Sequence, residues 1–391
     1  MSTAELQNGT HGQKQHPLVA SNITYNFTTE PRIVPDETLA NSGDDSICSD
    51  HMILVKWTIA NGWSNPELKP YGPLNLWPTS SCLHYATQCF EGMKVYRGHD
   101  RKLRFFRPER NVARFRISAE RISLPTFEPA ELLKLVQDLV SVDGPKWLPS
   151  SRPGSFMYLR PTLIGTQPQL GIQTPKEALL YVLMSFMPRL DTIPGGMRLE
   201  TSPDDMVRAW TGGFGYAKVG ANYGPSVKAL QATQNRGYHQ VLWLYGPQGE
   251  CTEAGGSNFF VVWERQDGKT ELITAPLDDK IILDGITRRS CLDLARQKLG
   301  DDLVVTERRY NIEELIDAND QGRLLEVFCC GTAYSMSPIS QIVHRGHKID
   351  IPTGALDKGG KVTCQLKEWL EEIMYGKADH EWATVVAGKK D

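Results

Sequence analysis

Residues 211–226 read Thr-Gly-Gly-Phe-Gly-Tyr-Ala-Lys-Val-Gly-Ala-Asn-Tyr-Gly-Pro-Ser, a segment with five glycines and one charged side chain, Lys218. An amine that loses solvation in such surroundings favours its uncharged form, so its pKa falls and it can act as a nucleophile. This is the chemistry of a lysine that forms a Schiff base. A solvated lysine in a flexible glycine-rich loop is the competing interpretation, and the surrounding sequence decides between the two.

The composition indicates a globular chain of two domains. Its 391 residues exceed the size at which single cores usually stop growing, about 250–300 residues. Apolar residues make up 40% and charged residues 23%, and the net charge of −3 creates no general attraction to nucleic acid or anionic membranes. No apolar run approaches the roughly 18 residues that a membrane span requires. We therefore expect no nucleic-acid partner and no membrane attachment.

The eight cysteines include no Cys-x-x-Cys pair, so the chain encodes neither a zinc ribbon nor a thioredoxin-like motif. Cys48 and His51 are two possible ligands without a second pair nearby, and we expect no metal site. The first 40 residues carry Lys14 and Arg32 as their only bases against four acids, which is unlike a mitochondrial presequence, and they lack the apolar core of a secretory signal. We expect a cytoplasmic protein.

Changes in composition along the chain predict four segments and an α+β (mixed α/β) fold. Residues 1–46 are polar and without period, which predicts a disordered or loosely docked tail. Residues 47–190 form a small N-terminal domain, with helices expected after Pro108 and over 131–142. A linker follows at 191–206, and residues 207–391 form a larger C-terminal domain with helices expected over 286–299 and 362–375.

Lys218 is followed by two residues that could serve a pyridoxal phosphate cofactor, which needs an acid at its ring nitrogen and a donor at its phenolate oxygen. Tyr223 lies five residues after Lys218 and could be that donor, although core packing of an aromatic ring explains it too. Glu253 stands among small residues, where a buried carboxylate would require a cation such as a protonated pyridine nitrogen. A solvated acid in a turn is the alternative.

Three further features could hold anions. The segment Asp284-Gly-Ile-Thr-Arg-Arg-Ser290 opens a predicted helix, so the amides of Ile286 and Thr287 can face a phosphate. Gly331-Thr-Ala333 is a second possible anion nest. Arg114 lies on the helix after Pro108, within a cluster of arginines that composition alone does not rank. Each signal is weak by itself.

The order of these elements resembles that of the branched-chain aminotransferases, which are fold-type IV pyridoxal-phosphate enzymes. The resemblance runs from about residue 50 to residue 375. The matching segments, in chain order, are Asp50-His-Met, Leu83-His-Tyr-Ala, Phe90-Glu-Gly-Met-Lys, Phe106-Arg-Pro, Met157-Tyr-Leu-Arg-Pro, Lys218-Val-Gly-Ala-Asn-Tyr-Gly, Thr252-Glu-Ala-Gly-Gly-Ser-Asn, Leu283-Asp-Gly-Ile-Thr-Arg and Gly331-Thr-Ala. Nine segments in order favour the Schiff-base interpretation of Lys218.

This resemblance implies a small N-terminal α/β domain and a larger C-terminal domain whose β-barrel-like sheet is flanked by helices. It implies that Lys218 forms the internal aldimine and then moves a proton between the substrate α carbon and the cofactor. Glu253 would keep the ring nitrogen protonated, and Tyr223 would bind the phenolate oxygen. The remaining cofactor contacts would come from Arg114, Ile286, Thr287 and Thr332 at the phosphate and from Leu283 on the ring.

For the substrate, the resemblance implies that the backbone at Thr332 and Ala333 receives the α-carboxylate. Arg160 would meet the distal carboxylate of glutamate. One pocket must then accept both an aliphatic chain and a carboxylate, so its apolar walls need a charged group at the rim. The walls would be Tyr85, Phe90 and Tyr158, with Leu170 and Ile172 reaching in from a partner subunit.

The implied activity is ping-pong transamination of leucine, isoleucine and valine with 2-oxoglutarate by a cytoplasmic homodimer, in branched-chain amino acid biosynthesis. An aminotransferase or amine transaminase of specialised metabolism is the alternative, because Gly43-Asp-Asp-Ser-Ile-Cys-Ser49 stands where the family usually has a Phe-Gly pair. A lyase acting on aminodeoxychorismate fits Arg160 less well. A binding protein that keeps the fold without catalysis is an alternative from another class.

Two smaller departures from the family pattern accompany this one. The segment Gly331-Thr-Ala-Tyr-Ser-Met-Ser-Pro338 lacks the two cysteines of the mammalian redox switch, so we expect no such regulation. Ala221 and Gly256 replace residues that are often Gly and Thr, which reshapes the surroundings of the cofactor modestly.

Overall fold

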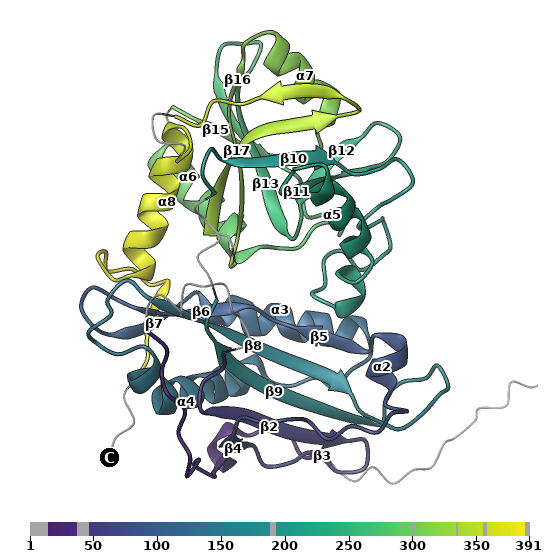
Figure 1. Ribbon diagram of the computed structural model, residues 1–391, viewed down its shortest axis with the longest axis vertical. Helices are drawn as coiled ribbons and strands as arrows, with labels where there is room; N and C mark the ends of the chain where they lie inside the picture. Colours follow the sequence, from purple (N-terminus) through teal and green to yellow (C-terminus); the bar gives the residue numbers. More distant parts are fainter. Residues whose placement is uncertain are drawn as a thin grey trace, which may run out of the picture.

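A computed structural model describes residues 15–36, 47–187, 193–300, 302–333, 335–354 and 358–387. These residues form two β-sheets, one below the other in Figure 1, with helices packed on each. No helix in the described ranges is both long and apolar enough to span a membrane.

The first sheet is mostly antiparallel and follows the order β1-β4-β2-β9-β8-β6-β7-β19, while β3 pairs with β2 and β5 with β8. Its long central strands β8 and β9 pair over most of their length, from Tyr158 opposite Ser185 to Gly165 opposite Ala178. The strands are β1 (Thr24–Tyr25), β2 (His51–Thr58), β3 (Gly62–Trp63), β4 (Glu67–Pro70), β5 (Gln88–Phe90), β6 (Met93–Arg97), β7 (Leu103–Phe106), β8 (Phe156–Gly165), β9 (Glu177–Ser185) and β19 (Ala383–Val385).

Two helices cover this sheet, and both were predicted from the sequence. Helix α3 (Pro108–Arg121) begins with a proline at its first position, as predicted, and buries Phe115 completely. Helix α4 (Pro129–Trp147) continues five residues beyond the predicted 131–142, through Asp143 and Lys146. The extension matters because these two residues hold the N-terminal segment.

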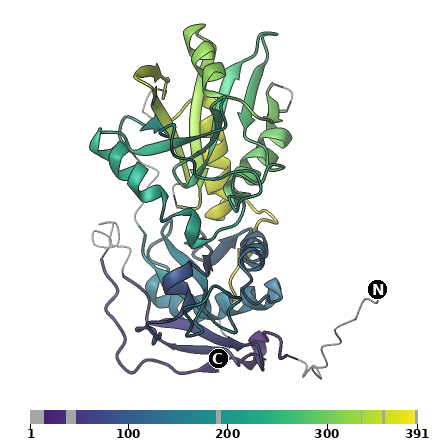
Figure 2. The same ribbon diagram turned by 90° about the vertical axis from the view of Figure 1, so that its right-hand side faces the viewer.

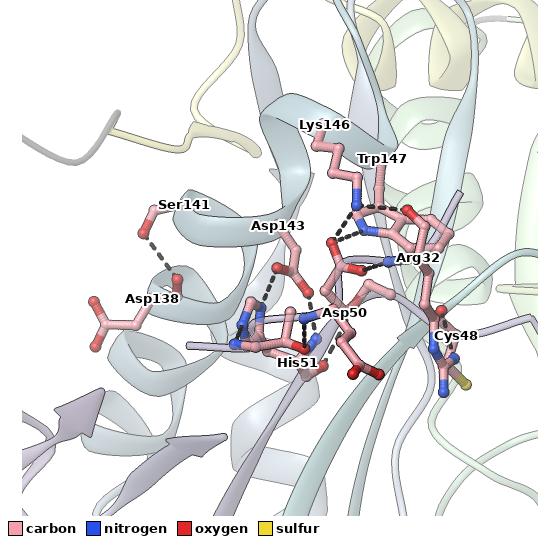
Figure 3. Close-up of polar contacts among 12 residues, drawn as sticks. Arg32, Cys48, Asp50, His51, Asp138, Ser141, Asp143, Lys146 and Trp147 are labelled. Atoms are coloured by element: carbon pink, nitrogen blue, oxygen red, sulfur yellow. Dashed lines mark hydrogen bonds and ion pairs between the residues drawn. The ribbon is translucent and has the colours of Figure 1, made fainter. Parts of the chain in front are cut away.

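The N-terminal segment 15–36 lies along the first sheet and helix α4. Strand β1 pairs in parallel with β4, and Leu18 and Ala20 are only 2% exposed. Polar contacts fasten the segment at Arg32, whose backbone amide donates to Asp50 Oδ1 at 2.7 Å and whose carbonyl accepts from Lys146 Nζ at 2.7 Å (Figure 3). Of the predicted tail, residues 15–36 are therefore docked, whereas 1–14 and 37–46 lie outside the described residues.

His51 provides a second fastening point for this segment. Its Nδ1 lies 2.6 Å from Asp143 Oδ1, and its Nε2 accepts the backbone amide of Thr28 at 3.0 Å (Figure 3). Because Cys48 and His51 contact protein groups here and neither belongs to a group of three or more possible ligands among the described residues, this part of the chain offers no metal site.

The second sheet contains a closed ring of six strands in the order β12-β11-β10-β17-β16-β13, which closes where β13 pairs with β12. Strands β14 and β15 extend it beyond β13, and β18 pairs with β17. This closed ring confirms the barrel-like sheet expected of the larger domain. The strands are β10 (Met197–Thr201), β11 (Gln240–Tyr245), β12 (Glu250–Ala254), β13 (Ser257–Glu264), β14 (Thr270–Thr274), β15 (Val304–Glu307), β16 (Leu324–Gly331), β17 (Ser335–His344) and β18 (His347–Asp350).

Helices surround this barrel (Figure 1). Helix α6 (Ile286–Lys298) packs against α8 (Lys361–Met374), close to the positions predicted for both. Helices α5 (Ser226–Asn235) and α7 (Ile312–Asp320) cover other parts of the sheet, and α7 begins with a capping box between Asn311 and Glu314.

The chain crosses between the sheets twice. Within the predicted linker 191–206, residues 197–201 form β10, because Met197, Leu199 and Thr201 alternate into the interior and pair with β11 and β17. After α8 the chain returns to the first sheet, where β19 pairs with β7. Figure 2 shows this yellow segment passing from the barrel to the lower sheet. The two sheets are thus tied together on both sides of the cavity described next.

Candidate active site

Lys218 lies where the two sheets meet, and its backbone is held from both sides. Its amide donates to Ser118 Oγ of α3 at 2.8 Å, and its carbonyl accepts from the amide of Phe90 in β5 at 3.1 Å. The side chain is half-buried, and Nζ donates to the Tyr223 hydroxyl at 3.0 Å. The structure therefore contradicts the alternative of a solvated lysine in a flexible loop.

The glycines around Lys218 permit close packing rather than motion. A Cβ atom on Gly215 would lie 2.1 Å from the carbonyl oxygen of Ile281, and one on Gly220 would lie 2.6 Å from Gln88 Nε2. Real Cβ atoms do not approach other atoms so closely. Gly215 thus brings the lysine segment against the residues that precede α6, and Gly220 brings it against β5.

Glu253 in β12 is a buried acid, only 1% exposed. Its Oε1 accepts from the amide of Leu283 at 3.3 Å and from Asn258 Nδ2 at 3.4 Å. Burial raises the pKa of the Glu253 carboxyl, and the charge of Arg208 opposes that rise. Its Oε2 lies beside the Arg208 guanidinium but has no hydrogen bond of normal geometry in the part of the chain that the structure describes.

An acceptor oxygen left without a donor in the interior fits the protonated ring nitrogen of a pyridoxal group. Arg208 was missed by the sequence analysis. It is an arginine in a stretch with no recognisable pattern, ten positions before Lys218, and no local signal marks it.

Arg114 is fixed as a cation beside the start of α6. Its Nε and Nη2 donate to the two carboxylate oxygens of Glu91 at 2.6 and 2.9 Å, and its Nη1 donates to the carbonyl of Asp284 at 2.9 Å. Burial favours the neutral form, but the neighbouring Glu91 outweighs it and raises the pKa of Arg114. A guanidinium has five N–H donors, so two remain for an anion. Glu91, 1% exposed, is a second residue that the sequence analysis missed.

The two predicted anion nests border one cavity of about 20 Å³. Ile286 and Thr287 form the first turn of α6, which has no side-chain cap, so its amides are available to a ligand. Gly331 and Thr332 border the same cavity from the end of β16. The next residue, Ala333, has its carbonyl bound by Lys94 Nζ at 3.3 Å.

Gly285, the N-cap of α6, links this cradle to the buried acid. A Cβ atom there would lie 1.9 Å from Asn258 Oδ1, and Asn258 in turn donates to the Leu283 carbonyl at 2.9 Å and to Glu253. The phosphate end and the ring-nitrogen end are therefore set by one packed unit. This spacing and donor set fit pyridoxal phosphate.

The predicted side-chain pocket is assembled around Phe90. Its ring packs against the ring of Tyr223, with centroids 5.0 Å apart. Arg160 lies over both Phe90 and Tyr158, at 4.7 and 5.0 Å from their ring centroids, and donates to the Tyr158 hydroxyl at 3.3 Å. Arg160 Nε is buried and has no hydrogen-bond partner among the described residues. A donor of this kind suits an incoming carboxylate.

Not every predicted pocket residue joins this cluster. Tyr85 in α2 (Ser81–Tyr85) donates its hydroxyl to the carbonyl of Leu170, and no hydrogen bond or ring contact in the described ranges links it to Phe90. Leu170 and Ile172 are 63% and 88% exposed. The departing segment 43–49 begins with four residues outside the described ranges, while Cys48 and Ser49 are buried beside β9.

Comparison with known proteins follows the same pattern. Residues 88–342 match the family model described as amino-transferase class IV. The chain is 41% identical over 367 residues to the mitochondrial branched-chain-amino-acid aminotransferase of Bos taurus, covering 93% of this chain and 91% of that protein. It is 44% identical over 342 residues to the cytosolic enzyme of Saccharomyces cerevisiae, covering 86% and 90%.

Solved structures agree with these sequence matches. A branched-chain aminotransferase from Thermoproteus uzoniensis with norvaline superposes with a TM-score of 0.67 at 25% identity, covering 86% of this chain and 100% of that one. A second branched-chain amino acid aminotransferase, complexed with N-(5'-phosphopyridoxyl)-L-glutamate and of the source abbreviated T.th., superposes with a TM-score of 0.64 at 26% identity, covering 85% and 98%.

Proposed function

The chain belongs to the class IV aminotransferases, among the branched-chain-amino-acid aminotransferases, and from that premise we propose how its residues transfer the amino group of leucine, isoleucine or valine to 2-oxoglutarate. The observation that carries the proposal is the position of Phe90. Its ring centroid lies 4.7 Å from Lys218 Nζ and 4.7 Å from the Arg160 guanidinium carbon. One aromatic wall thus separates the amine that acts at the α carbon from the cation suited to a distal carboxylate.

Pyridoxal phosphate, when bound, supplies an electron sink for the bonds at the substrate α carbon. Lys218 is positioned to take the proton from that carbon and return it, because its amine is held by Tyr223 and packed on Phe90 rather than solvated. Tyr223 can turn its hydroxyl proton toward the phenolate oxygen while it accepts from Lys218. Glu253 offers its free Oε2 to the ring nitrogen and keeps that nitrogen protonated.

Binding of the two substrates divides between shared and separate contacts. The backbone at Thr332 and Ala333 serves the α-carboxylate, which every substrate carries. Phe90 and Tyr158 serve the aliphatic chain of leucine, while Arg160 serves the second carboxylate of glutamate. Because Arg160 lies flat on two rings, an aliphatic chain can pack on the aromatic faces without burying an unpaired charge. The other proposed contacts are Arg114, Ile286 and Thr287 at the phosphate, Leu283 on the ring and Tyr85 at the pocket mouth.

We also propose that the enzyme is a cytoplasmic homodimer. The exposed Leu170 and Ile172, with Trp77 at 69% and Leu83 at 58%, are large apolar side chains of the kind that a second copy covers. Sedimentation of the holoenzyme tests this, with a mass of twice 43.8 kDa expected. The cytoplasmic assignment rests on the acidic N-terminal segment and is tested by fractionating cells that express the full chain.

A substrate panel tests the proposed function. Leucine, isoleucine, valine, phenylalanine and 1-phenylethylamine are each supplied with 2-oxoglutarate, and glutamate formation is measured. We expect the three branched substrates to have the highest kcat/KM. Turnover of phenylalanine or the amine without leucine would favour the specialised-metabolism alternative, and no turnover of any of them would favour a binding protein.

A further inference from the structure

A groove of about 310 Å³ lies between helix α3, Tyr216 and the segment 277–289. It is called the α3 groove below. Its walls include Arg114, Asp284 and Ile286, so it backs onto the phosphate cradle. It contains none of the residues of the Phe90 cluster, and it is therefore separate from the proposed substrate pocket.

The α3 groove is largely apolar. Its floor contains Ile282 and Ile286, which are 2% and 7% exposed, and one wall is formed by Ile117 of α3, which is 46% exposed. Ala113, Tyr216 and Leu277 complete the apolar lining. Its volume falls at the lower end of the roughly 300–1,000 Å³ typical of small-molecule pockets. An exposed isoleucine above a buried apolar floor is suited to a compact hydrocarbon or aromatic body.

The charges at its edge are predominantly positive. Arg289 is paired with Asp284 at 2.6 Å, and Arg114 is paired with Glu91. Arg110 and Lys280 have no ion pair within the described ranges, and the Lys280 ammonium lies 5.3 Å from the Tyr216 ring centroid. The α3 groove thus presents two cations whose charges are not neutralised by the described part of the protein.

The backbone at Lys280 adds a second, independent feature. Lys280 has φ +56°, a left-handed conformation that costs energy for a residue with a Cβ and is normally left to glycine. Its amide donates to the carbonyl of Leu277 at 3.1 Å, which closes a tight turn at the edge of the α3 groove. A lysine at this strained position keeps its ammonium at the apolar lining, where glycine would serve the backbone better.

We propose that the α3 groove is a binding site for a small amphipathic carboxylate, with its apolar body against Ile117, Tyr216 and Ile282 and its carboxylate between Arg110 and Lys280. A carboxylate matches the unpaired cations, and an apolar body of amino-acid size matches the volume. This site goes beyond the proposed transamination and does not depend on it.

The test uses the holoenzyme and 4-tert-butylbenzoate, which has an apolar body and one carboxylate but no amino or 2-oxo group and so cannot react. Binding is followed by saturation-transfer NMR of the probe. Two variants remove the site: Ile117→Glu places a negative charge on the wall, and Lys280→Gly removes a cation at a position whose backbone glycine adopts without strain. Each is expected to weaken binding at least about tenfold.

Matched controls are available elsewhere in the chain. Ile59 is an exposed isoleucine at 51%, and Arg101 is an exposed cation with φ +66°, so Ile59→Glu and Arg101→Gly repeat both changes away from the α3 groove. Both should bind the probe as the unaltered enzyme does, and leucine at ten times its KM should not displace the probe.

Three results would overturn the proposal. Displacement by leucine would place the probe in the substrate pocket. Unchanged binding by Ile117→Glu and Lys280→Gly would place it elsewhere, and the lack of saturable binding up to about 10 mM would mean that no such site exists. Because the readout is binding, a failure of transamination leaves this test intact.

Discussion

The Nζ atom of Lys218 lies 3.0 Å from the hydroxyl oxygen of Tyr223, and the turn between them is held rigidly. The intervening 3-10 turn η2 (Gly220–Asn222) ends at Asn222, whose Nδ2 donates to the carbonyls of Ala217 and Phe214 at 2.7 and 2.9 Å. A buried amide side chain thus fixes the loop on both sides of the lysine. The amine can therefore act at one place rather than sweep through solvent, which is what proton transfer at a single carbon requires.

Lys218→Ala should lower the leucine turnover rate by about 10³-fold or more, because the imine-forming amine and the proton carrier are lost together. The visible absorbance of bound cofactor should lose its sensitivity to added leucine. Lys228→Ala, which removes an exposed lysine of α5, is the control and should react normally. Turnover near the normal rate in Lys218→Ala would refute the assignment of the lysine.

Tyr223→Phe should lower kcat by about 10-fold to 100-fold while KM for leucine changes little, since one hydrogen bond to a charged group contributes about 1.5–3 kcal/mol. The phenyl ring keeps its packing on Phe90, so the loss reports the hydroxyl. Tyr245→Phe removes a hydroxyl that bonds Thr211 instead, and its kinetics should be normal. Equal losses in both variants would mean that the effect comes from loop stability.

Glu253→Gln should weaken cofactor retention and lower the melting temperature. The neutral amide leaves Arg208 buried without a charge partner, and breaking a buried pair in this way costs about 3–5 kcal/mol. Dialysis of the holoenzyme followed by absorbance measures retention, and calorimetry measures the stability. Glu264→Gln, at an exposed position of the neighbouring strand β13, should leave both unchanged. Normal retention in Glu253→Gln would show that this acid does not meet the ring nitrogen.

Arg160→Met should raise KM for 2-oxoglutarate by about 10-fold or more and leave KM for leucine nearly unchanged, because only one of the two substrates has a second carboxylate. Methionine keeps the packing between Phe90 and Tyr158. Arg116→Met removes a 39% exposed arginine of α3 and serves as the control. A rise in KM of equal size for both substrates would show that Arg160 shapes the pocket rather than reading the charge.

Asp50→Asn should destabilise the first sheet by about 1–3 kcal/mol at pH 7, measured by urea unfolding. Burial opposes ionisation, but hydrogen bonds from Lys146, the Arg32 amide and Trp147 outweigh it and lower the pKa of the Asp50 carboxyl (Figure 3). A folded-state pKa below the ordinary value near 3.9 contributes stability that is complete above that value and lost as pH falls through the folded pKa.

The stability difference between Asp50→Asn and the unaltered enzyme should therefore be constant from pH 8 to about pH 5 and shrink below about pH 4. Asp278→Asn, at a position away from this cluster, is the comparison and should show no difference at any pH. A difference that grows on acidification would show that the Asp50 carboxylate is not the form that the fold stabilises.

Prediction from the sequence was most successful where the signal was local. Pro108, followed by apolar residues at helical spacing, predicted α3, and the cap and first turn at Gly285 and Ile286 predicted the start of α6. It failed for β10 inside the supposed linker, because that short strand alternates only three inward residues and is stabilised by its neighbours β11 and β17. The docked segment 15–36 was equally hard to foresee, since its partners Asp50 and Lys146 lie far along the chain.

The sequence by itself determined which chemical groups the enzyme has: the lysine in a glycine-rich segment, the tyrosine after it, the acid among small residues and the two anion nests. Their spacing along the chain is local information and can be read without coordinates. Only the tertiary structure decided that Glu91 orients Arg114, that Arg208 faces Glu253 and that Tyr85 stands apart from Phe90. These relations join residues on different elements, and burial decides whether a charge needs a partner, so they exist only once the two sheets have packed together.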